Sequence, residues 1–97
     1  MILAYVLGNV WSTRKEEALK GFKFLVVQPV TLTYEESGRP RFEKYGNTLI
    51  AADRIGAGET EIVMIASGSS ARQSLEDQRA PIDAVVIGII DKETFQG

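Results

Sequence analysis

The stretch Ala52–Gln73 reads ADRIGAGETEIVMIASGSSARQ and places one apolar run between two glycine clusters. The run from Glu59 to Ser67 is rich in Ile and Val and is typical of a β-strand. The first cluster, Gly56-Ala57-Gly58, comes before this strand, whereas a phosphate loop needs a helix after its glycines. We therefore predict a hairpin turn in which Gly56 and Gly58 take positive φ.

The second cluster, Ser67–Ser70, precedes a segment with helical signals. Ser70 and Gln73 have capping-box spacing, which predicts a short helix over Ala71–Asp77. A serine nucleophile would need a general base, and the chain contains no His to supply one. The lysines form no motif with the serines, so helix capping is favoured over catalysis.

Arg72 falls in the first turn of this predicted helix, where a positive charge opposes the helix dipole. Its position predicts an acidic partner, within the subunit or in another one. The candidates are Asp53, Glu61 and Asp83.

The rest of the chain predicts four more strands and little helix. Gly21 would end a helical turn that Thr13 and Glu16 start with capping-box spacing. Pro29 cannot donate to a strand ladder, which predicts an edge or a bulge there. The polar segment Tyr34–Gly46 is a turn or an exposed hairpin extension. The other predicted strands are Ile2–Trp11, Phe24–Leu32, Asn47–Asp53 and Asp83–Asp91.

These elements predict one mainly β domain over residues 1–97, a small five-stranded OB-like β-barrel with one short helix. The strand segments FLVV, IVMIA and VVIGII are apolar on both faces, although a barrel in water should alternate. One explanation is that Val and Ile occur on both faces simply because they are favoured in strands. The alternative, which we favour, is that another subunit covers the outer face.

Composition excludes several kinds of site. The 97 residues include no Cys and no His, which removes thiolate metal sites, cysteine nucleophiles and the commonest zinc ligand. The adjacent acidic pairs lie in polar segments and fix no metal or glycosidase constellation. We expect no catalytic, cofactor or metal site. No signal peptide and no apolar run of membrane-spanning length is visible, which predicts a soluble intracellular protein.

One binding function stays open as an alternative. Trp11, Phe22, Phe24 and Tyr45 could stack on bases, as aromatic residues do in OB-like nucleic-acid-binding domains. The net charge of −2 provides no broad basic surface for the backbone phosphates. Packing in the core or at an interface is therefore the favoured role of these aromatic residues.

The motifs together resemble the EutN/CcmL family of bacterial microcompartment vertex proteins. The opening AYVLGNVWSTRKEEALKGFKFLVVQPV and the closing PIDAVVIGIID are similar to the family as well, so the resemblance covers nearly the whole chain apart from the middle at about Tyr34–Gly46. Thr60 stands where family members often have glycine, so its turn must be remodelled if the position needs positive φ. The matching positions are Asp53, Gly56, Ala57, Gly58, Glu61, Gly68, Ser69, Ser70, Ala71, Arg72, Pro81 and Asp83.

The resemblance implies a β-barrel subunit that forms homopentamers without catalytic residues, cofactors, nucleic acid or a membrane. Such pentamers close the vertices of a polyhedral shell in the bacterial cytoplasm, and hexamer-forming shell proteins tile the rest. Residues near a five-fold axis meet their own copies, so small uncharged side chains are favoured there. The candidates, with the serine cluster slightly preferred, are Gly56, Ala57, Gly58, Ser67, Gly68, Ser69 and Ser70.

Overall fold

The computed structural model describes residues 1–10, 17–19, 21–68, 71 and 82–91. This part of the chain is mainly β, as predicted, with six strands where the sequence indicated five. The elements are β1 (Ile2–Val10), the 3-10 turn η1 (Glu17–Leu19), β2 (Lys23–Tyr34), β3 (Pro40–Lys44), β4 (Leu49–Asp53), β5 (Ile62–Ser67) and β6 (Ala84–Ile90).

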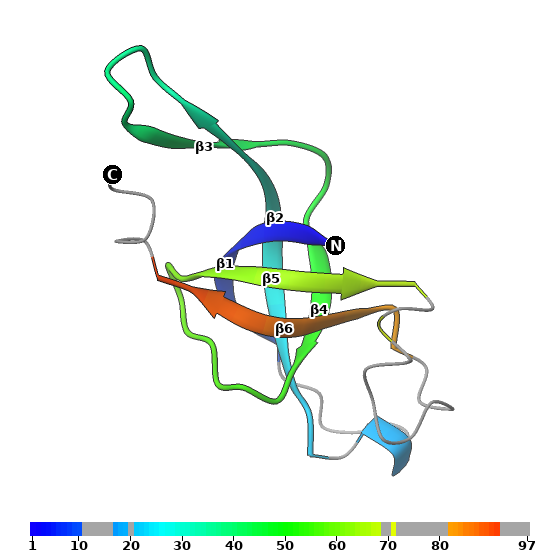
Figure 1. Cartoon of the computed structure of the whole chain (residues 1–97). Coiled ribbons are helices and arrows are strands. Elements are labelled where there is room, and N and C mark those ends of the chain that lie inside the picture. The colour runs from blue at the N-terminus through cyan, green and yellow to red at the C-terminus, as the bar shows by residue number, and fades with distance from the viewer. Residues whose placement is uncertain (11–16, 20, 69–70, 72–81, 92–97) are drawn as a thin grey trace.

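One sheet holds all six strands, in the order β1-β5-β6-β4-β2-β3, and β1 pairs with β2 as well. Every pairing is antiparallel except that of β4 with β6, which is a single parallel bridge between Ala52 and Val85. Because the sheet curls, β5 and β6 lie in front of β2 and β4 in Figure 1. The molecule therefore has two layers, and β1 pairs with a strand of each.

The extra strand, β3, belongs to a hairpin that projects from the curled sheet. Val30 to Tyr34, the end of β2, pairs with β3, and we call residues 30–44 the arm (Figure 1). Pro29 lies where β2 changes partner, since pairing with β4 ends at Val27 and pairing with β3 starts at Val30. The prediction of an edge at Pro29 is confirmed, and Tyr34–Gly46 is indeed a hairpin extension.

The main core lies between the two layers. Alternate residues of β1 and β2 point into it, for example Ala4 and Val6 on β1 and Leu25 and Val27 on β2. This is the period of two that a strand with one core-facing side requires. Ala57, which lies outside the strands, also packs into this core.

A second apolar cluster covers part of the outer side of the sheet. Ala52, Ala66 and Val85, from three strands, meet Ala71 and Ile82, and Phe22 packs against them. The chain thus covers with its own residues some of the outer face that the sequence left for another subunit. Phe24, an outward-pointing residue of the segment FLVV, packs against this cluster.

The helical predictions fall partly outside the described residues. Glu17–Leu19 forms a 3-10 turn, and Gly21 follows it with φ 87°, as expected for a glycine that ends a helical turn. Of the helix predicted over Ala71–Asp77, only Ala71 is described, and it is helical and buried. None of the helical residues described here belongs to a helix long and apolar enough to cross a membrane.

Candidate assembly surfaces

The loop after β4 is built around the carboxylate of Asp53. This side chain is only 2% exposed. Its Oδ1 accepts the amide of Ile55 at 2.8 Å, its Oδ2 accepts that of Ala57 at 2.7 Å, and Gly56 donates to both oxygens at 3.2 Å. Charge-assisted bonds of this kind compensate a buried carboxylate for the water it has lost. Asp53 therefore fixes the shape of the Gly-Ala-Gly loop.

The hairpin predicted for this loop is wrong, because β4 and β5 are not paired with each other. The loop instead carries the chain from the β2–β4 layer to the β5–β6 layer. Gly56 does take positive φ, at 100°, but Gly58 does not. Thr60 takes it instead, with φ 71°, so the expectation that threonine would force another backbone conformation here is wrong, and Thr60 adopts the one that glycine favours.

The end of the loop is attached to its surroundings by further hydrogen bonds. The Thr60 amide donates to the Val6 carbonyl at 3.0 Å, and the Val6 amide donates to the Glu61 carbonyl at 2.9 Å. The Gly58 amide donates to Oε1 of Glu61 at 2.7 Å. Nζ of Lys23 donates to the Ala57 carbonyl at 2.9 Å. The loop is thus held to both β1 and β2.

The candidate axis residues have different surroundings. Gly56, Ser67 and Gly68 are exposed, Gly58 is half-buried, and the Ala57 side chain points into the core. Gly68 takes φ 62°, and its amide donates to the Asp83 carbonyl at 2.8 Å. Ser69 and Ser70 lie outside the described residues.

The predicted ion pair of Arg72 stays a prediction, because Arg72 lies outside the described residues. The structure does place its three acidic candidates. Asp53 is buried among backbone amides, Glu61 is half-buried next to Gly58, and Asp83 is exposed just before β6.

The aromatic residues do not form an open platform in the described part of the chain. Phe22 and Phe24 pack against the second apolar cluster, and the guanidinium of Arg54 stacks 5.2 Å from the centre of the Phe22 ring. Tyr45 is exposed beyond the end of β3, and Trp11 lies outside the described residues. Packing is therefore the role of the two phenylalanines, as favoured from the sequence. Among the described side chains, none gather into a group of three or more that could hold a metal ion.

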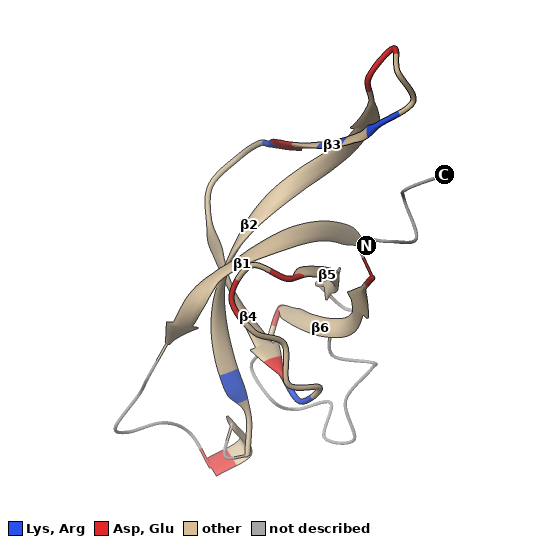
Figure 2. Ribbon diagram, turned by 90° about the vertical axis from the view of Figure 1, so that its left-hand side faces the viewer, with Lys and Arg blue, Asp and Glu red and all other residues tan. Residues whose placement is uncertain are grey.

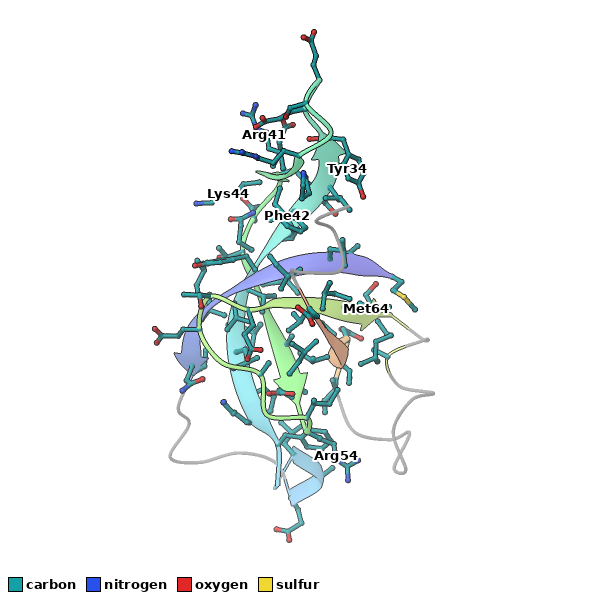
Figure 3. The ribbon with its side chains drawn as sticks, turned by 60° about the vertical axis from the view of Figure 1, so that its left-hand side comes forward. Tyr34, Arg41, Phe42, Lys44, Arg54 and Met64 are labelled. Carbon is teal, nitrogen blue, oxygen red and sulfur yellow. The ribbon has the colours of Figure 1, made fainter. Side chains whose placement is uncertain are left out.

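An apolar groove lies between the arm and the outer face of β1 and β5. It is open to solvent, has a volume of about 480 Å³ and is lined by Tyr5, Val30, Phe42, Lys44 and Ile62. Figure 3 shows Phe42 and Lys44 at the base of the arm, next to the curled sheet. The sequence analysis missed this groove, because its lining comes from β1, the arm and β5, which are far apart in the chain. We call it the arm groove.

Charged residues are absent from the strands on one side of the arm groove and are concentrated on the arm at its other side. Figure 2 shows Lys, Arg, Asp and Glu on the arm, the loops, η1, the start of β2 and the end of β4. In contrast, β1, β5 and β6 contain no charged residue along their whole length. Three adjacent strands without charge are unusual on a sheet that faces water, where polar side chains alternate with apolar ones. This surface has the character of one that becomes buried.

Comparisons with known proteins agree with an assembly surface. Residues 1–91 match the family described as ethanolamine utilisation protein EutN/carboxysome. The bacterial microcompartment shell vertex protein GrpN of Rhodospirillum rubrum (strain F11) is 43% identical over 91 residues, covering 94% of this chain and 93% of GrpN. The solved GrpN pentameric microcompartment shell protein superimposes with a TM-score of 0.73 at 42% identity, covering 94% of each chain. A solved EutN ethanolamine utilisation protein superimposes with a TM-score of 0.78 at 36% identity, covering 94% of this chain and 86% of that one.

Proposed function

This chain belongs to the EutN/CcmL family, and we propose on that premise that it forms the pentameric vertices of a bacterial microcompartment shell. The observation that carries the proposal is the likeness to a pentameric shell protein over 94% of both chains. The uncharged strands β1, β5 and β6 support it, because each subunit of a ring must bury part of its surface against two neighbours. The role is structural rather than catalytic.

We propose that the curled sheet closes as an OB-like barrel. The pairings support this, since they run from β1 through β5, β6, β4 and β2 and return to β1. The Ala52–Val85 bridge joins the two layers on the far side from β1. A closed barrel leaves few free strand edges, which suits a subunit whose contacts must be limited to its ring and shell neighbours.

We further propose that the Ser67–Ser70 loop faces the five-fold axis. Ser67 and Gly68 support this because they are exposed, small and uncharged, so five copies can approach without repulsion. A Ser67→Trp substitution would then place five indoles at the axis and weaken the ring, whereas Ser37→Trp at the exposed tip of the arm should leave it intact. If the rings of the two variants are equally stable, Ser67 does not lie at the axis.

Arg72 is proposed to pair with Asp53, Glu61 or Asp83, within or between subunits. Loss of one partner from a buried pair leaves an uncompensated charge, so Arg72→Ala should lower the stability of the assembly by about 3–5 kcal/mol. An Arg72→Ala ring that melts and assembles like the parent would refute the pairing.

The partners proposed for the pentamer are hexamer-forming shell proteins, in a shell located in the bacterial cytoplasm and without nucleic acid. A sheet of hexagons needs pentagonal corners to close into a polyhedron. Co-expression with hexamer-forming shell proteins should therefore yield closed particles in electron microscopy, and omission of this chain should yield open or irregular ones. Identical particles with and without the chain would contradict the proposed function.

A further inference from the structure

The strand residues next to the arm groove, on the layer that contains β5 and β6, are also apolar. Tyr5 on β1 pairs with Ile62 on β5, and Ile62 pairs with Ile90 on β6. Paired residues of neighbouring strands share one face of a sheet. The neighbouring pair Ala4–Val63 points into the core, so the row of Tyr5, Ile62 and Ile90 points outward. Ile62 itself is only 2% exposed, so the accessible apolar surface here comes from the half-buried Tyr5 and Ile90 on either side of it.

A second apolar patch lies on the other layer, which contains β2 and β4. Val26 on β2 pairs with Ile50 on β4, and their chain neighbours Leu25, Val27 and Ala51 point into the core. Val26 and Ile50 therefore point outward, and the Ile50 residue is 51% exposed. We call this patch the Ile50 face.

The arm groove and the Ile50 face lie on opposite sides of the core. The groove lies between the arm and the outer face of β1 and β5, while the Ile50 face belongs to the parts of β2 and β4 that lie behind β5 in Figure 1. A closed ring of identical subunits uses a heterologous interface, in which two different patches of each subunit meet. Two different apolar patches on opposite sides of the core, one of them a groove, satisfy this requirement.

We infer that the arm groove of each subunit receives the Ile50 face of the next copy around the ring. The inference rests on the proposed pentameric function and identifies the surfaces that form it. A second copy is the occupant because this chain resembles a pentameric protein over 94% of its length, and a ring must use two such patches. The groove offers about 480 Å³, which is room for several aliphatic side chains. The walls of the groove on β1 and β5 carry no charge, and Lys44 on the arm is the one charged residue among its described lining residues.

The first test compares two isoleucines of equal exposure. Ile50 is 51% exposed and Ile55, in the loop after β4, is 50% exposed, so a charged side chain can be placed at either without disturbing the core. In native mass spectrometry, Ile50→Glu should raise the protein concentration at which the ring dissociates by about tenfold or more, because it buries a charge and removes an apolar contact. Ile55→Glu should leave that concentration close to that of the parent. An Ile50→Glu ring as stable as the Ile55→Glu ring overturns the inference.

The second test uses the absence of cysteine from the chain, which makes any disulfide attributable to introduced residues. Under mild oxidation the double variant Lys44→Cys/Ile50→Cys should form a covalent ladder of up to five chains. The matched variant Lys44→Cys/Ile55→Cys should not, and neither single variant should, because a heterologous interface keeps copies of one residue apart. Equal cross-linking through positions 50 and 55 overturns the inference while the pentamer stands. A monomeric parent protein overturns the proposed function itself.

Discussion

Thr60 adopts a backbone conformation that its side chain disfavours. It is the one residue other than glycine with positive φ in the described part of the chain. A β-branched residue in this region is strained, because its Cβ crowds the backbone. The hydrogen bonds between Val6 and the Thr60–Glu61 segment hold the conformation in place. The sequence alone showed that threonine replaces a glycine at this position, but it did not show whether φ is positive there. The strain could therefore be predicted only for the case of a positive φ.

Thr60→Gly should therefore stabilise the protein. Relief of the strain is expected to raise the free energy of unfolding by about 1 kcal/mol, less the extra freedom of glycine in the unfolded chain. For a domain of this size the thermal midpoint should rise by about 4 °C at fixed protein concentration, as followed by circular dichroism. Thr31→Gly, at an exposed position of β2, is the control and should lower the midpoint. A fall of similar size in both variants would show that Thr60 is not strained.

The position of each strand could be predicted from the sequence, but which strands pair with each other could not. Runs of β-branched residues placed β1, β2, β4, β5 and β6 within a few residues of where they lie, and Pro29 marked the point where β2 changes partner. The hairpin predicted between β4 and β5 was wrong because Asp53 folds the intervening loop around its own carboxylate. Strand pairing over long distances in the chain leaves no local pattern, so the arm groove could not be foreseen either.

The arm should be separable from the rest of the fold. None of its β3 residues belongs to either apolar cluster, and β3 pairs only with the end of β2. Replacing residues 32–42 with Asn-Gly would join Thr31 to Glu43, which face each other across the hairpin, by a two-residue turn. The shortened chain should keep the far-ultraviolet circular dichroism and the core NMR signals of the parent, while its ring dissociates at higher concentration. Loss of the folded spectrum would show that the arm supports the core, contrary to this account.

At the scale of the whole molecule, apolar residues on both faces of the strands have two causes. On β4, β5 and β6 the outward residues Ala52, Ala66 and Val85 are covered by the chain itself. Ile62, which lines the arm groove, is also covered within the chain and is only 2% exposed, whereas Ile50 is 51% exposed and belongs to the patch assigned to a neighbouring subunit. The sequence indicated the excess of apolar surface correctly but could not divide it between these two uses, because that division depends on which segments fold back over the sheet.

The central claim, that this chain forms a closed five-membered ring, is tested most directly by native mass spectrometry of the purified protein at micromolar concentration. The account predicts one dominant species with five times the 10.7 kDa mass of the chain, which persists on dilution and gives way to single chains only when the solution is made denaturing. A spectrum of monomers or dimers across the micromolar range would contradict the claim.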